Sequence, residues 1–258
     1  MRYFLELAYN GTSFHGWQVQ PNAVCVQSSV ENALAKILQS SIPIVGAGRT
    51  DTGVHARQMF AHFDYGKEIK DIKKFLLSLN SIVGRDICIK NLFPVDGDAH
   101  ARFDASQRTY KYFVSFSRNP FLKDFFWFSP SYLDLDKMNL ASRIIEETSD
   151  FTSFAKLHSD AKTNICKVSN AEWCHIRNDK QALEFIGDID DGIVFTISAD
   201  RFLRNMVRAI VGTLVDVGRN KMDLIDFRNI IGEKNRCSAG MSMPANALFL
   251  WDIKYPFF

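Results

Sequence analysis

The sequence predicts an α+β protein made of two halves with the same layout. Several short segments alternate apolar and polar residues, as half-buried strands do, and other segments repeat apolar residues at helical spacing. Both kinds occur in the order strand, helix, strand, strand, helix, strand, and this order appears twice. Tandem β-α-β-β-α-β units are typical of two ferredoxin-like halves with antiparallel sheets. Helices on one face of such a sheet leave the other face available for binding.

The first half contains four expected strands and two expected helices. Alternation such as that of Tyr3, Leu5 and Leu7 predicts strands. The expected strands cover residues 2–9, 42–47, 57–64 and 86–93. Apolar residues spaced along one helical face predict helices over 26–38 and 72–79.

The second half repeats this order and adds one short helix near its end. Its expected strands cover residues 110–116, 169–177, 192–199 and 248–255. Its expected helices include one from Leu135 through Ile145, a long one that contains Leu203 through Leu214, and one around 223–232. The boundary is expected near 98–106, which gives an N-terminal half of residues 1–100 and a C-terminal half of residues 101–258.

The composition is that of a globular protein without strong charge. Hydrophobic residues make up 47% and charged residues 23%, which argues against disorder, and the net charge of +2 permits a nucleic-acid partner without requiring one. Five cysteines without a CxxC pair favour neither a disulfide framework nor a zinc site. No signal peptide or transmembrane segment is predicted, so we expect no membrane association and a reducing, cytoplasmic location.

A glycine-rich loop at residues 46–56 is the most informative stretch. It has the sequence Gly-Ala-Gly-Arg-Thr-Asp-Thr-Gly-Val-His-Ala. Expected strands lead into it and out of it, and glycines allow sharp turns and close approach to a ligand. The loop therefore presents the carboxylate of Asp51 where two strands end, with Arg49 nearby. The alternative is a tight hairpin whose aspartate caps its own turn.

From Gly48 to Ala56, without a break, this loop resembles the signature of the TruA family of tRNA pseudouridine synthases. In that family the aspartate at the position of Asp51 is the catalytic residue. The resemblance continues in segments 7–18, 20–22, 100–103, 108–112, 202–208, 211–212, 244–245 and 248–250. The sequence departs from the family pattern at Ala99, Ser149, Met241–Met243 and Ala247, all of them outside the Asp51 loop.

The resemblance implies an architecture and an activity. The antiparallel sheets of the two halves would meet around an RNA-binding cleft. The activity would be the isomerisation of uridine to pseudouridine at positions 38 to 40 of the tRNA anticodon stem-loop, by a homodimer. This reaction imports no group and changes no oxidation state, so we expect no cofactor and no metal.

Three residues are candidates for the chemistry. A carboxylate such as Asp51 can act on the ribose as nucleophile or as general base, and the sequence leaves both roles open. The resemblance places an arginine partner for Asp51 at Arg208, and a tyrosine that stacks on uracil and handles the C5 proton at Tyr110. On pattern alone, Tyr110 could be a core residue of its strand. Arg208 could belong to a solvated helix stripe with Arg201 and Arg204.

Basic residues that line the cleft would hold the phosphates of the RNA. Because only this lining must be basic, a protein with a net charge of +2 can still bind such a substrate. The residues expected to contact substrate, besides Tyr110, are Arg49, His55, Arg57, Arg102, Arg108, Arg204 and Leu248. Lys111 and Arg201 are further candidates for the basic lining. His55 is expected to hydrogen-bond its loop and not to perform acid–base chemistry.

Two other classes of function fit parts of the sequence. A non-catalytic RNA-binding protein with two RRM-like halves would carry an aromatic RNP run, which this sequence lacks. A hydrolase with an aspartate nucleophile would need a second carboxylate or base near Asp51. None is visible near it in the sequence, and the acidic cluster of Asp188, Asp190 and Asp191 lies between two glycines and is typical of a turn.

Overall fold

The computed structural model describes residues 1–156, 162–187 and 191–257. These form two compact units: Met1–Ser106 with the C-terminal residues from Phe249 onward, and Gln107–Leu248. Strands and helices are mixed in both units, which confirms the predicted α+β class. The division into halves at residue 100 stays a prediction. Asp188 and Asp190 lie outside the described residues.

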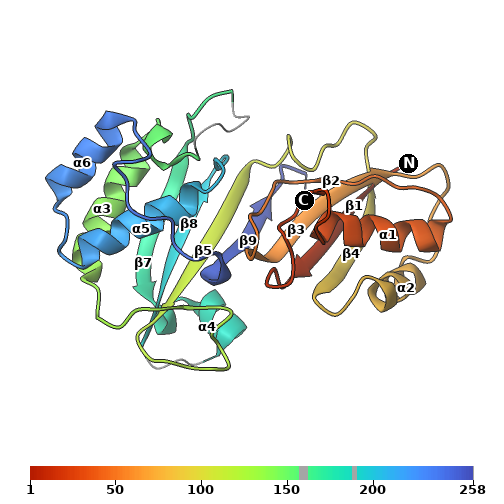
Figure 1. Ribbon diagram of the computed structural model, residues 1–258. Coiled ribbons are helices and arrows are strands. Elements are labelled where there is room, and N and C mark those ends of the chain that lie inside the picture. Colours follow the sequence, from red (N-terminus) through yellow and green to blue (C-terminus); the bar gives the residue numbers. More distant parts are fainter. Residues whose placement is uncertain (157–161, 188–190, 258) are drawn as a thin grey trace. The chain divides into compact units, whose positions relative to one another are not determined.

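The first unit contains a mixed sheet (Figure 1). Its strands follow the order β4-β1-β3-β9, with β2 beside β3. The strands are β1 (Arg2–Tyr9), β2 (Val45–Gly46), β3 (His55–Asp64), β4 (Ile87–Val95) and β9 (Leu248–Lys254). β1 pairs with β3 and β4 in antiparallel fashion, whereas β9 runs parallel to β3 and places Phe249 opposite His55.

Two helices complete the first unit, and both match the predicted ones. Helix α1 (Val26–Leu38) and helix α2 (Ile72–Ile82) contact each other, and α2 also packs on β4. The N–H of Lys74 donates to the Asp71 side chain at 2.9 Å, which satisfies one of the open donors of the first turn of α2. Burial of one apolar face stabilises each helix more than its intrinsic propensity does.

The strand predicted over residues 42–47 is wrong in most of its length, because only Val45–Gly46 pairs with β3. Helix α1 supplies the reason. The side chain of Gln27 donates to the carbonyl of Ile44 at 3.1 Å, and the N–H of Ile44 donates to Glu31 Oε1 at 3.0 Å. Both backbone groups of Ile44 are therefore satisfied by side chains, and the segment needs no strand partner there.

The second unit has a sheet in the order β5-β8-β7, with the short β6 beside β5. The strands are β5 (Gln107–Ser115), β6 (Trp127–Phe128), β7 (Val168–His175) and β8 (Gly192–Ala199). The helices are α3 (Leu135–Glu147), α4 (Lys180–Ile186), α5 (Met206–Gly218) and α6 (Leu224–Glu233). β6 and α4 were not predicted, because segments this short show no clear periodicity. Helix α3 contacts β7, α5 and α6.

Helix α5 begins later than predicted. Asn205 adopts a left-handed conformation, with φ of 65°, and the helix starts at Met206. Residues before Asn205 therefore do not continue the helical spiral. The alternative of a helical arginine stripe is wrong, because Arg201 and Arg204 precede the helix that carries Arg208. Among the described residues, no helix is both long and apolar enough to cross a membrane.

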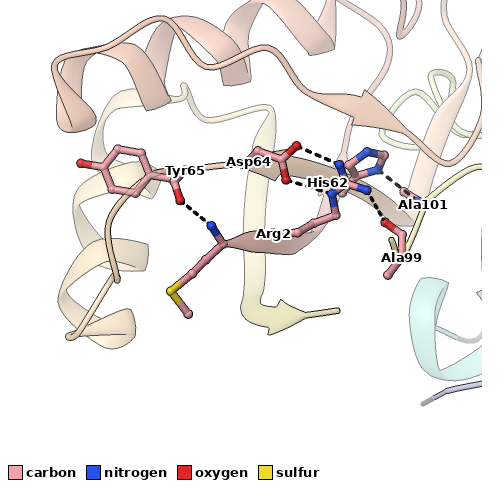
Figure 2. Close-up of polar contacts among 7 residues, drawn as sticks. Arg2, His62, Asp64, Tyr65, Ala99 and Ala101 are labelled. Atoms are coloured by element: carbon pink, nitrogen blue, oxygen red, sulfur yellow. Dashed lines mark hydrogen bonds and ion pairs between the residues drawn. The ribbon is translucent and has the colours of Figure 1, made fainter. Parts of the chain in front are cut away.

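Arg2 joins three segments of the first unit (Figure 2). Its Nε and Nη2 donate to the two carboxylate oxygens of Asp64 at 2.9 and 2.8 Å, and its Nη1 donates to the carbonyl of Ala99 at 3.0 Å. This two-donor contact holds the pKa of Asp64 below its usual value. Arg2 thereby links β1, the end of β3 and the segment that follows β4.

His62 lies beside this contact and is buried in neutral form. The N–H of Ala101 donates to its Nδ1 at 3.1 Å, so the proton of the neutral ring lies on Nε2 (Figure 2). The ring stacks with Phe4 at 6.0 Å and meets the ring of His100 edge-on at 4.6 Å. Burial, with His100 and Arg2 adding to it, lowers the pKa of His62 from 6.5 to about 4.

We expect His62 to make folding stability pH-dependent in a defined window. Above pH 6.5 the ring is neutral in both states, so its contribution is fully present. Between pH 6.5 and 4 the unfolded chain takes up a proton that the folded chain excludes, and stability falls by about 3 kcal/mol. Urea unfolding at stepped pH should show this slope, and His62→Gln should reduce it to the part that His100 contributes, because burial also lowers the pKa of His100.

The matched control for this prediction is His15→Gln, which removes an exposed histidine of the same unit. The stability that the Asp64 carboxylate contributes is lost only at lower pH, once the pH drops below 3.8, the ordinary pKa of this carboxyl group. The assignment to His62 is contradicted if His62→Gln keeps the wild-type slope between pH 6.5 and 4.

Candidate active site

The Asp51 loop connects β2 to β3 in the first unit. The loop ends in a turn in which the N–H of Val54 donates to the carbonyl of Asp51 at 3.1 Å. Gly53 within this turn has φ of 79°, which side chains disfavour. Asp51 itself is half-buried. The glycine pattern predicted a strand–loop–strand connection that displays this carboxylate, and the loop has that form, although the incoming strand is short.

A second segment, residues 10–17, encloses the loop. The N–H of Trp17 donates to the carbonyl of Thr50 at 3.2 Å, and the N–H of Gly53 donates to the carbonyl of Phe14 at 3.3 Å. The hydroxyls of Tyr9 and Thr50 share a buried hydrogen bond of 2.9 Å. The residue before Asp51 is thus held from two sides, which fixes the backbone that carries the carboxylate.

Gly16 closely approaches the loop backbone next to Asp51. Its φ is +88°, and a Cβ at this position would lie 2.5 Å from the carbonyl oxygen of Thr50. We expect Gly16→Ala to destabilise the protein by more than about 2 kcal/mol, because a methyl group must displace backbone in an already disfavoured conformation. Urea unfolding measures this loss.

Gly66→Ala is the matched control, because a Cβ there meets nothing within 4 Å and the residue has no positive φ. Its effect should stay within about 1 kcal/mol. Equal losses from the two substitutions would show that the Thr50 contact does not decide the outcome.

His55 supports the enclosing segment from within β3. Its ring is 1% exposed, and its Nδ1 accepts a hydrogen bond from the N–H of Gly11 at 3.0 Å. The ring also stacks on Phe249 at 4.5 Å. His55 therefore hydrogen-bonds the backbone of segment 10–17, and the expected hydrogen bond to its own loop stays a prediction. A role for His55 in substrate contact stays a prediction.

Three arginines of the first unit were predicted to contact substrate. Arg49 is exposed, and its Nε donates to Gln18 at 3.1 Å. The guanidinium of Arg57 lies 4.9 Å from the ring centroid of Trp251, a cation–π distance. Arg102 is exposed and lies 5.8 Å from the ring of Phe103. Of these, Arg49 and Arg102 are the more accessible to a phosphate.

Tyr110 and Arg208 belong to the second unit. The half-buried Tyr110 ring meets Phe202 edge-on at 5.1 Å. Two residues along β5, on the same face, the hydroxyl of Tyr112 donates to the carbonyl of Pro244 at 3.1 Å. Burial raises the pKa of Tyr112, and the positive charge of Arg208 opposes this shift. Tyr112 and Arg208 are therefore electrostatic neighbours beside the Tyr110 strand.

Arg208 is half-buried on α5, and its Nε donates to the carbonyl of Met243 at 2.6 Å. Sequence reasoning missed this contact, because Met243 contributes a backbone atom whose position no side-chain pattern reveals. A fixed Nε orients the plane in which an arginine presents its remaining donors.

The other predicted residues of the second unit differ in accessibility. Arg108 donates from Nη1 to the carbonyl of Asp200 at 2.7 Å, Arg204 is exposed, and Leu248 is buried. Lys111 does not fit the expected basic lining, because it is 4% exposed and forms an ion pair with Asp179. Asp179 also caps α4, so this lysine has a structural partner.

The two units thus present complementary chemistry. The first holds a carboxylate on an enclosed glycine loop with exposed arginines on the same unit. The second carries a half-buried tyrosine and an oriented arginine. A carboxylate of this kind can act as nucleophile or general base, and the exposed arginines suit a polyanionic substrate, so these features are those of an enzyme that acts on a polyanion.

Comparison with known proteins agrees with this class. The tRNA pseudouridine synthase family profile matches residues 7–104 and 145–256. A tRNA pseudouridine synthase A from Bacteroides fragilis is 51% identical over 255 residues, which span 99% of this chain and 96% of that protein. Its counterparts from Parabacteroides distasonis and Caldicellulosiruptor bescii are 50% and 37% identical, over 99% and 97% of this chain and 96% and 98% of their own lengths.

The chain belongs to the tRNA pseudouridine synthase family. The resemblance noted in the sequence is confirmed, as is the enzyme class, an isomerase of that family. The roles of individual residues are a separate question, since family membership alone assigns none of them.

Proposed function

We propose that this chain converts uridine to pseudouridine at positions 38 to 40 of the tRNA anticodon stem-loop, with Asp51 as the catalytic residue. The relatives at 50% and 51% identity carry the name tRNA pseudouridine synthase A and match nearly the whole chain. The observation that carries the proposal is the Asp51 carboxylate on a glycine loop whose backbone is fixed on both sides.

In the proposed reaction, the N-glycosidic bond of the target uridine breaks, the uracil turns over, and its C5 bonds to the same ribose carbon. The proton on C5 must then leave and the released N1 takes up a proton, so atoms and charge balance without an oxidant or a cofactor. Asp51 would act on the ribose as nucleophile or base. Arg208 would hold that carboxylate ionised and in place, and Tyr110 would stack on uracil and handle the C5 proton through its hydroxyl.

The target uridine must leave its stack to reach a carboxylate, which costs a few kcal/mol that backbone contacts must offset. We propose that the arginines described above, Arg49 and Arg102 foremost, contribute those contacts. The expected substrate partners thus remain Tyr110, Arg49, His55, Arg57, Arg102, Arg108, Arg204 and Leu248. No step of this scheme requires a metal or a cofactor.

We also propose that each unit is a ferredoxin-like half, that the halves enclose an RNA-binding cleft, and that the protein is a cytoplasmic homodimer. The strand order β4-β1-β3-β2 in the first unit, with α1 and α2 in the connections, supports a ferredoxin-like arrangement. The antiparallel order β5-β8-β7 supports it in the second. All five cysteines are free, which suits a reducing compartment.

The test is to incubate the purified protein with tRNA transcripts that carry a single uridine at position 38, 39 or 40 and to map pseudouridine. Conversion at these positions, and none when they carry cytidine, is the expected result. Conversion only elsewhere would refute the positional proposal. Release of free uracil would indicate a hydrolase, and binding without conversion would indicate a binding protein.

A further inference from the structure

The segment 236–243, here called the α5 strap, lies directly on the backbone of helix α5. The N–H of Gly240 donates to Thr213 Oγ1 at 2.9 Å. A Cβ on Gly212 would lie 1.8 Å from the carbonyl oxygen of Met241, and one on Gly240 would lie 2.8 Å from the Thr213 Cα. Glycine on both sides therefore permits a helix-to-strap distance that no other residue allows.

The end of the strap holds Arg208 at two points. The N–H of Met243 donates to the backbone carbonyl of Arg208 at 3.1 Å, and the Nε of Arg208 donates to the carbonyl of Met243 at 2.6 Å. Met243 is 5% exposed, so the strap side of this reciprocal contact is buried. The position of one strap carbonyl thus sets the plane of the Arg208 guanidinium.

Arg236 fixes the strap from its other end. Its Nη2 donates to Ser242 Oγ at 2.7 Å, and its Nη1 donates to the carbonyls of Gly240 and Ala239 at 3.1 and 3.4 Å. Ser242 Oγ also accepts from Asn205 Nδ2 at 2.6 Å. A single guanidinium therefore organises three strap residues, and the Ser242 hydroxyl ties them to the start of α5.

Asn205 has an unusual conformation for the residue that precedes a helix. Its φ is 65°, and its side chain makes no capping hydrogen bond to α5 but reaches Ser242 instead. An asparagine that forgoes a cap gives up the stabilisation that this residue type usually supplies at a helix start. The strap contact takes the place of that cap, which links the first turn of α5 to Arg236.

We propose that Arg236 is a positioning residue for the isomerisation: through Ser242 and the Met243 carbonyl it fixes the orientation of the Arg208 guanidinium. The inference rests on the proposed role of Arg208. It also explains why the sequence can depart from the family pattern at Met241–Met243. The Met241 side chain is 80% exposed, and Met243 acts through its backbone, so only the hydroxyl at position 242 contributes side-chain chemistry.

The experiment compares Arg236→Met with Arg208→Lys and with the double variant, in the full-length protein and with a tRNA transcript as substrate. We expect Arg236→Met to lower kcat by about 10- to 100-fold, as a small misplacement of a catalytic partner does, and to change KM less than twofold. Ser242→Ala should lower kcat in the same way, whereas Ser242→Thr keeps the hydroxyl and should restore turnover.

Arg228→Met is the matched control, since Arg228 is an exposed arginine of α6 in the same unit whose ion pair with Glu147 spans 3.9 Å. It should leave kcat unchanged. Thermal unfolding of every variant separates loss of folded protein from loss of turnover, and kcat is referred to the folded fraction.

The double variant decides whether Arg236 acts through Arg208. If it does, adding Arg236→Met to Arg208→Lys lowers kcat no further. Full additivity of the two losses, or wild-type kcat in both Arg236→Met and Ser242→Ala, overturns the positioning role while leaving the proposed function intact. Wild-type kcat in Arg208→Lys overturns the role of Arg208 in the proposed function, and the positioning role with it.

Discussion

Asp51→Asn is expected to abolish pseudouridine formation while tRNA binding stays nearly unchanged. Asparagine has the same shape as aspartate but lacks the charge, so it can neither attack the ribose nor accept a proton from it. The hydrogen bond that closes the turn uses the backbone carbonyl of Asp51, which asparagine retains. The loop should therefore keep its form, and the loss should exceed about 10⁴-fold in turnover, as for removal of a catalytic nucleophile or base.

Mapping pseudouridine in a tRNA transcript measures turnover, and filter binding measures affinity for the same transcript. Asp86→Asn is the matched control, because it removes one negative charge from an exposed position of the same unit. It should convert tRNA at the wild-type rate. Turnover by Asp51→Asn within tenfold of wild type would show that another group performs the chemistry.

Sequence patterns predicted most elements because burial of one face imposes a period on the residues. Helix α1 follows its predicted range, since its apolar residues recur at helical spacing. The short β2 could not be foreseen. Side chains of α1 form hydrogen bonds with the backbone groups of Ile44, and no residue within 42–47 predicts these bonds. The late start of α5 has a similar cause, because the left-handed Asn205 interrupts a continuous apolar pattern.

In the candidate site, too, features within one short stretch of sequence could be predicted, whereas contacts between distant residues could not. The glycines and Asp51 lie in one short stretch, so the loop could be predicted. Its enclosure could not, because Gly16 and Thr50 are far apart in the sequence and meet through backbone atoms. Lys111 shows the converse error. A lysine in a predicted strand fits a basic lining by type alone, whereas Asp179 pairs with it in the interior.

Tyr110→Phe should lower turnover and Tyr112→Phe should lower folding stability, although both remove one hydroxyl from the same face of β5. Phenylalanine at position 110 keeps the ring, which meets Phe202 edge-on, and should still hold uracil. It lacks the hydroxyl proposed to manage the C5 proton. Product formation should therefore fall by about 10²- to 10⁴-fold, the range for loss of a general acid or base.

Tyr112 is the matched control for this prediction. Its buried hydroxyl donates to the carbonyl of Pro244, so Tyr112→Phe leaves an acceptor unsatisfied and should cost about 1 to 2 kcal/mol of folding stability. Turnover per folded molecule should change little. For Tyr110→Phe, tRNA affinity and the midpoint of urea unfolding should stay near wild type while turnover is lost. If instead Tyr110→Phe turns over normally and Tyr112→Phe does not, the hydroxyl that serves the C5 proton lies one step further along β5, beside Arg208.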